Sequence, residues 1–108
     1  MMRKLLLLTF LIFPYLGAHA NQMPRYNPEA YCQQVASFSG GSSMIFNGCI
    51  DMEQKSYNNL KRIWASIPSR TQNYCDEVAS TTGGSYSILE GCIDMEIEAA
   101  SSKKGFQF

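Results

Sequence analysis

One pattern of 23 residues occurs twice in this chain. Tyr31–Glu53 reads YCQQVASFSGGSSMIFNGCIDME, and Tyr74–Glu96 reads YCDEVASTTGGSYSILEGCIDME. The offset is 43 residues throughout, with no gap. Both copies open on Tyr-Cys, contain Gly-Gly-Ser at the centre and close on Gly-Cys-Ile-Asp-Met-Glu. A tandem repeat of this kind predicts one structural unit that occurs twice.

The cysteines lie symmetrically about the glycine pair of each copy. Cys32 lies eight residues before the first glycine and Cys49 eight residues after the second, and Cys75 and Cys92 repeat this spacing. If both flanks are helices, each cysteine lies roughly 12 Å from the turn, because an α-helix rises about 1.5 Å per residue. Two antiparallel helices then hold their cysteines at one level, as a disulfide requires. We therefore predict the bonds Cys32–Cys49 and Cys75–Cys92.

A β-hairpin is the alternative, since Gly-Gly also forms tight primed turns. The apolar residues after each turn favour helices instead, because they recur three, four or eight residues apart. These residues are Ile45, Cys49, Met52, Leu60, Ile63 and Ile67 in the first copy, and Ile88, Cys92, Met95 and Ala99 in the second. The sequence thus predicts an all-α fold made of two disulfide-stapled antiparallel helical hairpins, four helices in all.

Start and stop signals place these helices. Asn27 and Pro28 are typical of an N-cap and a first helical position, and Ser69 with Gln72 has the spacing of a capping box. The segment 21–26 has no such signal and is expected to be a loose lead-in. The expected helices cover residues 28–38, 43–66, 69–82 and 85–100. Repeat 1 then spans about 27–67, repeat 2 about 68–101, and 102–108 form a flexible tail.

The first twenty residues have the pattern of a signal peptide. Arg3 and Lys4 precede a largely apolar stretch, Leu5 to Leu16, and Ala18-His19-Ala20 is a small-x-small cleavage site. We expect residues 1–20 to be removed and 21–108 to form a single small helical domain. The stretch is too short for a membrane span, so the mature chain is expected in the periplasm or outside the cell, without a membrane span.

The composition of the mature chain limits its chemistry. Residues 21–108 keep seven Lys or Arg and nine Asp or Glu, which gives no electrostatic case for binding nucleic acid. His19, the only histidine, lies in the leader, so a histidine triad and most zinc sites are excluded. A core of 88 residues is marginal, and two disulfides, each closing an 18-residue loop, fit an exported chain that needs reinforcement.

The four cysteines allow a second hypothesis. Cys49 and Met52 lie three residues apart, as do Cys92 and Met95, and soft sulfur ligands suit Cu(I). A core-facing helix stripe produces the same spacing, and Met is a common filler of cores. The paired C-x-x-C spacing of a zinc or redox site is absent from the sequence. We favour structural disulfides and expect no cofactor.

Two acidic residues recur in each copy. Asp51 and Asp94 face away from both apolar stripes, so they are expected on a solvated face, with contact to a partner as the functional alternative. Glu53 and Glu96 fall between the stripes, level with the start of the first helix in their own hairpin. A carboxylate there accepts hydrogen bonds from free N–H groups and complements the helix dipole. We predict that both glutamates cap helices; catalysis by a buried acid is the alternative.

The aromatic residues have two interpretations. Tyr31 and Tyr74 precede the first cysteine of each copy, and Trp64 is the single tryptophan. Such residues are typical interface anchors. In so small a chain they are also typical core residues, which is the interpretation we favour.

A family resemblance covers about 33 residues. The features are Trp-Ala-Ser-Ile-Pro at 64–68, Tyr-Cys at 74–75, Gly-Gly-Ser-Tyr at 83–86 and Cys-x-x-x-Glu at 92–96. This stretch resembles a family of small exported uncharacterised proteobacterial proteins. The first copy departs from the family at Ser42-Ser43, where the tyrosine is missing. The resemblance implies a bacterial envelope protein and brings no catalytic residue.

These features lead to one main hypothesis and two alternatives. We expect a non-enzymatic exported module that binds an unknown protein or envelope component, with Asp51 and Asp94 as possible contact residues. The first alternative is a small hydrolase that uses a pair of carboxylates. The second is a copper-handling protein.

Overall fold

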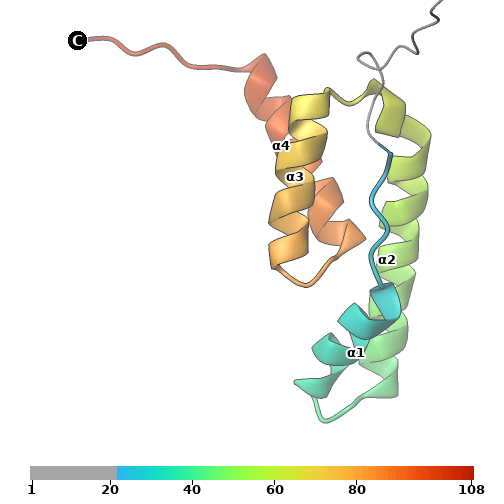
Figure 1. Cartoon of the computed structure of the whole chain (residues 1–108). Coiled ribbons are helices and arrows are strands. Elements are labelled where there is room, and N and C mark those ends of the chain that lie inside the picture. Colours follow the sequence, from blue (N-terminus) through green and yellow to red (C-terminus); the bar gives the residue numbers. More distant parts are fainter. Residues whose placement is uncertain (1–21) are drawn as a thin grey trace, which may run out of the picture.

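Four α-helices make up most of this computed structural model, which describes residues 22–108 (Figure 1). The predicted leader and its cleavage site lie outside the described residues. The helices and the short 3₁₀ turn η1 are, in chain order, α1 (Pro28–Ser37), α2 (Ser43–Ile63), η1 (Trp64–Ser66), α3 (Ser69–Thr81) and α4 (Tyr86–Ser101). The all-α prediction is confirmed, and each helix lies within three residues of its expected bounds.

The helices form two antiparallel hairpins, α1–α2 and α3–α4, and the second hairpin packs against α2. At about 1.5 Å per residue the 21 residues of α2 extend roughly 31 Å. α1 packs against the part of α2 that follows the first turn, and α3 packs against α4. The second hairpin contacts the later part of α2 through α4 (Figure 1). The two hairpins therefore meet mainly along the α2–α4 interface.

Both hairpin turns use glycines with positive φ and a capping serine. The φ angles are 71° and 80° at Gly40 and Gly41, and 103° and 82° at Gly83 and Gly84, a region that only glycine occupies without strain. In each turn the second glycine donates its N–H to an alanine carbonyl five residues earlier, at 2.9 Å. The serine that follows caps the next helix. The two turns thus have one geometry.

The disulfides have the predicted connectivity. Cys32 is bonded to Cys49 with a Cα–Cα distance of 5.6 Å, and Cys75 is bonded to Cys92 with 5.5 Å. No free cysteine is found in the part of the chain that the structure describes. Each bond links the two helices of one hairpin, as equal spacing from the turn implies.

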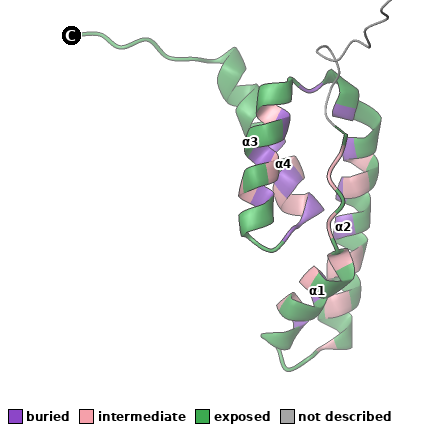
Figure 2. Ribbon diagram, in the orientation of Figure 1, coloured by how far each residue is buried: buried purple, intermediate pink, exposed green. Residues whose placement is uncertain are grey.

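The hydrophobic core is distributed unevenly. It lies where the end of α2 meets the second hairpin, and its apolar members are Leu60, Trp64, Ile67, Cys75, Ala79, Tyr86, Leu89 and Ile93. Outside this core, the only buried apolar residues among those that the structure describes are Cys32 and Ala36 on α1. Figure 2 shows the same contrast along the chain. Trp64 is a core residue, as expected, whereas Tyr74 is 51% exposed, so the core assignment of Tyr74 is wrong.

The lead-in is ordered by specific contacts, contrary to the sequence-based expectation. The N–H of Tyr26 donates to the hydroxyl of Tyr86 at 2.9 Å, and that hydroxyl donates to the carbonyl of Pro24 at 2.9 Å. The hydroxyl of Tyr26 donates to Asp76 on α3 at 2.7 Å. The segment therefore contacts both helices of the second hairpin. An aromatic ring with hydrogen-bonding partners far along the chain gives no local sequence signal.

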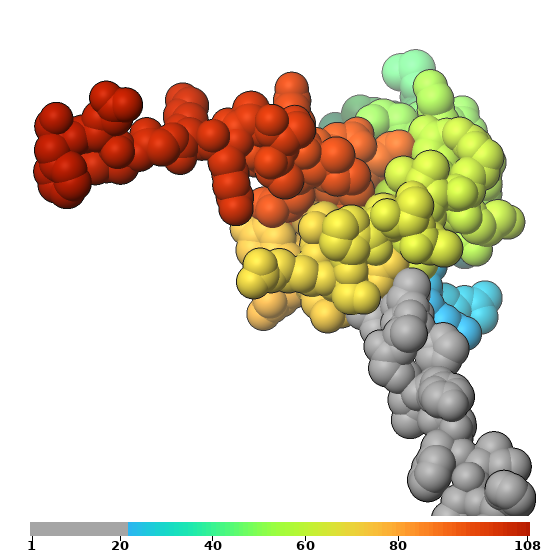
Figure 3. All heavy atoms as spheres, turned by 90° about the horizontal axis from the view of Figure 1, so that it is seen from above, coloured from blue at the N-terminus to red at the C-terminus, as the bar shows by residue number. Residues whose placement is uncertain are grey.

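Two further details concern the start of α3 and the C-terminal tail. The expected capping box at Ser69 is wrong: Pro68 occupies the N-cap position of α3, and Gln72 is buried and donates to the carbonyl of Trp64 at 2.8 Å. At the other end, residues 103–108 are exposed and project from the body of the helices (Figure 3). The flexibility predicted for 102–108 stays a prediction.

Candidate binding cleft

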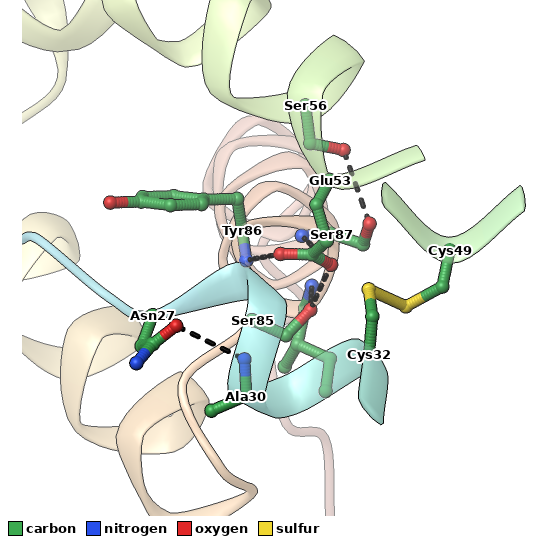
Figure 4. Close-up of a disulfide and its surroundings, with 10 residues drawn as sticks. Asn27, Ala30, Cys32, Cys49, Glu53, Ser56, Ser85, Tyr86 and Ser87 are labelled. Atoms are coloured by element: carbon green, nitrogen blue, oxygen red, sulfur yellow. Dashed lines mark hydrogen bonds between the residues drawn. A yellow bond between two sulfur atoms is a disulfide. The ribbon is translucent and has the colours of Figure 1, made fainter. Parts of the chain in front are cut away.

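A buried carboxylate joins the two hairpins. Glu53, 2% exposed on α2, accepts a hydrogen bond from the hydroxyl of Ser85 at 2.6 Å and from the backbone N–H of Tyr86 at 2.6 Å. The N–H of Ser87 lies 3.3 Å from the same oxygen that Ser85 contacts. Figure 4 shows the side chain pointing at this turn, beside the Cys32–Cys49 bond. Glu53 therefore caps the N-terminus of α4.

The capping prediction for Glu53 holds for the function of the side chain and is wrong for the helix. Its target is the second helix of the other hairpin, whereas the sequence placed it on the first helix of its own. Asn27 caps α1 instead, accepting from Ala30 at 3.0 Å. The side chain of Glu96 is exposed and accepts no hydrogen bond among residues 22–108, so the second predicted cap is absent there. Counting residues back from a turn gives the height along a helix but not the direction of a side chain.

The α2–α4 interface around Glu53 is polar on one edge. The hydroxyl of Ser56 lies 3.4 Å from that of Ser87, and the amide of Asn59 donates to Glu90 at 3.0 Å. A carboxylate at a helix N-terminus is favoured by the free N–H groups and by the helix dipole. Every buried side-chain nitrogen and oxygen of the described residues has a partner. This satisfied seam fixes how the hairpins meet.

Three tyrosines from different parts of the chain meet next to this cap. The ring centroids of Tyr26 and Tyr86 are 4.7 Å apart, and those of Tyr57 and Tyr86 are 5.0 Å apart with an edge-on geometry. Lys61 lies over the ring of Tyr57, with its Nζ 5.4 Å from the centroid. Rings in such arrangements attract one another beyond the area they bury.

The phenols of Tyr26 and Tyr86 are kept neutral. Burial raises the pKa of Tyr26 well above its usual range, and the hydrogen bond to Asp76 and the charge of that carboxylate raise it further. Burial also raises the pKa of Tyr86, partly offset by its hydrogen bond with the backbone of Tyr26. Neither hydroxyl is therefore a base or nucleophile near neutral pH.

An open cleft of about 500 Å³ lies over the tyrosine cluster. Its walls come from the lead-in, the start of α1, the middle of α2 and the first residue of α4: Arg25, Tyr26, Asn27, Pro28, Glu29, Ile50, Glu53, Gln54, Tyr57 and Tyr86. The lining thus combines three tyrosine rings with one cation, two carboxylates and two side-chain amides. Residue-type patterns did not indicate this site, because its walls come from four separate segments.

A second, more apolar groove of about 350 Å³ lies on α1 and α2 and reaches the start of α4. It is lined by Tyr31, Val35, Ile45, Gly48, Cys49, Met52, Glu53 and Ser87. The ring of Tyr31, which lines this groove, lies against Gly83: a Cβ on that glycine would stand 3.4 Å from the ring carbon Cδ1. Tyr31 thus contacts the turn of the second hairpin.

The repeated aspartates take no part in either hollow. Asp51 and Asp94 are exposed on α2 and α4, and neither lines the cleft or the groove. Their solvated position agrees with expectation, and their contact with a partner stays a prediction. Within residues 22–108 no group of three His, Cys, Asp or Glu side chains is arranged to hold a metal ion, and none of the helices there is long and apolar enough to cross a membrane.

Comparisons with known proteins add no assignment. No family model, no curated protein and no solved structure matches this chain. The cleft and the Glu53 cap are therefore the features from which a function can be inferred.

Proposed function

We propose that this protein is an exported, non-enzymatic module whose cleft holds an extended segment of a partner protein in the cell envelope. The observation that carries the proposal is the cleft over Tyr26, Tyr57 and Tyr86. Tyrosine supplies a large contact area at a low cost in side-chain entropy, and it is enriched where proteins bind other proteins. Because the cleft is open, an extended segment can lie in it while the rest of the partner chain continues outside.

The polar groups at the rim define the kind of segment. Arg25 and Glu29 carry opposite charges at the cleft, and Gln54 offers both a donor and an acceptor. Such a set is suited to the N–H and C=O groups of an extended backbone, while the tyrosines accommodate an apolar side chain. A site that combines aromatic rings with a few placed polar groups is typical of ligand recognition.

The non-enzymatic half of the proposal rests on how the reactive groups are used. Both oxygens of Glu53 accept hydrogen bonds from the start of α4, and the phenols of Tyr26 and Tyr86 are neutral. The cysteines are bonded in pairs, which leaves no thiolate for the copper hypothesis. The buried carboxylate of Glu53 and the phenols of Tyr26 and Tyr86 thus have structural roles.

Export is supported by the covalent structure. Disulfides form and persist in oxidising compartments such as the periplasm and the extracellular space. Two of them stabilise a chain whose first hairpin buries few apolar residues. This agrees with the leader pattern of residues 1–20.

Site-specific photo-cross-linking tests the proposal. A benzoylphenylalanine is placed at Gln54 in the cleft, and separately at Asp51 and at Asp94, and each variant is irradiated in intact cells. We expect a discrete adduct from position 54. Adducts only from 51 or 94 would move the site to the repeated aspartates, and no adduct from any position would contradict binding.

A charge change tests the cleft independently. Arg25→Glu should weaken the position-54 adduct, whereas Arg70→Glu on the exposed part of α3 should leave it unchanged. Equal adducts from both variants would contradict a site at the cleft. Turnover of a peptidoglycan or glycan substrate by the purified chain would overturn the non-enzymatic half.

A further inference from the structure

The contact between the two repeats is made by residues that occur in both of them. On repeat 1, Glu53 and Tyr31 reach across to repeat 2, where Glu53 caps the turn at Ser85 and Tyr31 covers Gly83. We call Glu53 with Tyr31 the capping pair, and the turn that they cover the capped turn. Each repeat contains both parts, because the pattern is written twice at an offset of 43 residues.

The capping pair of repeat 2 caps no turn among the described residues. Glu96 stands where Glu53 stands, and Tyr74 stands where Tyr31 stands. The side chain of Glu96 is exposed and makes no hydrogen bond among residues 22–108, and Tyr74 is 51% exposed. Both side chains belong to helices that hold the same hairpin geometry as α1 and α2, since the two disulfides match.

The corresponding turn of repeat 1 is not covered by a capping pair, although it has a similar local geometry. Ser42 caps α2 by accepting from Ile45 at 3.2 Å, as Ser85 caps α4 by accepting from Ile88 at 3.2 Å. Gly41 donates to the carbonyl of Ala36 at 2.9 Å, which matches the bond made by Gly84. A Cβ on Gly40 would meet nothing within 4 Å, where Gly83 meets a tyrosine ring.

We propose that copies of this chain associate head to tail, with Glu96 of one copy capping the Ser42 turn of the next. Tyr74 of the first copy then covers Gly40 of the second. The interaction continues the interface that already exists inside the chain. Because the two surfaces differ, the contact is heterologous and builds an open chain or a ring of copies rather than a symmetric dimer.

The apolar surface on α2 supports this occupant. Leu89 and Ile93 on α4 are fully buried under α2, whereas the equivalent Phe46 and Ile50 are only half-buried, since no preceding repeat covers them. On the surface that carries Glu96, Ala99 and Ala100 replace Ser56 and Tyr57, and Lys103 replaces Leu60. The smaller apolar contact makes association between copies weaker than the internal interface, so it depends on concentration.

Sedimentation equilibrium of the exported chain over a range of concentrations tests the proposal. The capping variant is Glu96→Ala, which removes the carboxylate of the capping pair. The turn variant is Ser43→Glu, which places a charge at the exposed start of α2 that repels an incoming carboxylate. Glu98→Ala is the matched control, exposed on the same helix but without a counterpart in the internal contact. Melting curves of all variants establish that they are folded.

The expected pattern is specific to head-to-tail contact. Wild type and Glu98→Ala should increase in average mass with concentration, while the capping variant and the turn variant each stay at the mass of one chain. An equimolar mixture of the two variants should reach the mass of two chains and no more, because one intact interface remains. A wild type that stays at one chain at its highest soluble concentration, equal association of Glu96→Ala and Glu98→Ala, or a monomeric mixture would each overturn the proposal.

Discussion

The carboxylate of Glu53 on α2 accepts a 2.6 Å hydrogen bond from the backbone N–H of Tyr86, the first residue of α4. This bond joins residues 33 positions apart and crosses from one repeat to the other. A charged acceptor strengthens such a hydrogen bond, and the buried position shields it from solvent and salt. Glu53 therefore contributes directly to the relative position of the two hairpins, beside the contacts of Ser56 and Asn59 with α4.

The first disulfide should control the stability of α1 alone. On α1 only Cys32 and Ala36 are buried, so replacing Cys32 and Cys49 by Ser should free α1 and speed amide hydrogen exchange there. Replacing Cys75 and Cys92 by Ser should instead lower the melting temperature of the whole domain, since that bond lies in the main core. Each bond closes a loop worth roughly 3 kcal/mol in the chain-entropy model. Exchange rates that rise equally in all four helices after removal of the first bond would refute this difference.

Tyr26 should stabilise the domain although it precedes the first helix. Tyr26→Phe removes the hydrogen bond to Asp76 and should cost about 1 kcal/mol. Tyr26→Ala also removes the ring contact with Tyr86 and should cost about 2–3 kcal/mol. Urea unfolding of both variants, with the exposed Gln22→Ala as a control, measures these losses. A Tyr26→Ala midpoint equal to that of the control would mean that the lead-in contributes nothing.

Alkaline pH should destabilise the protein through the same tyrosines. The pKa values of Tyr26 and Tyr86 are raised in the folded state, mainly by burial. Their contribution is therefore fully present below the unfolded pKa of about 10 and is lost as pH rises above it. Urea midpoints at increasing pH above 10 should fall more steeply for wild type than for Tyr26→Phe. Parallel curves would contradict a shifted phenol at this position.

The repeat explains why so much of the fold was predictable. Equal spacing of Cys32 and Cys49 about a glycine pair fixes the hairpin and its disulfide, and these are local relationships along the chain. The partner of Glu53 was not predictable, because it depends on how one hairpin rotates about α2. The helical phase that placed Glu53 between two apolar stripes was the available signal, since a carboxylate there must meet a polar partner when it is buried.

The cleft was missed for a similar reason. Its walls combine Arg25 and Tyr26 with Gln54 and Tyr57, and the rings of Tyr26 and Tyr57 both pack against Tyr86 of the second hairpin. The segment 21–26 contains no helix start or stop signal, so Tyr26 was expected in a loose lead-in before the first helix. Its hydrogen bond to Asp76 spans 50 residues, and no periodicity or spacing in the sequence reports such a contact.

Thermal melting of Glu53→Ala beside Glu96→Ala, in dilute solution, tests the central claim most directly, because the repeat makes the two residues equivalent in sequence and the structure makes them different. Glu53→Ala leaves the buried donors Ser85 and Tyr86 without their acceptor, which should cost about 2–3 kcal/mol and lower the melting temperature by roughly 10–20 °C. Glu53→Gln should fall between wild type and the alanine variant, because both carboxylate oxygens accept hydrogen bonds and an amide keeps only one acceptor. Glu96→Ala should melt like wild type, and equal losses from Glu53→Ala and Glu96→Ala, or no loss from either, would contradict the account.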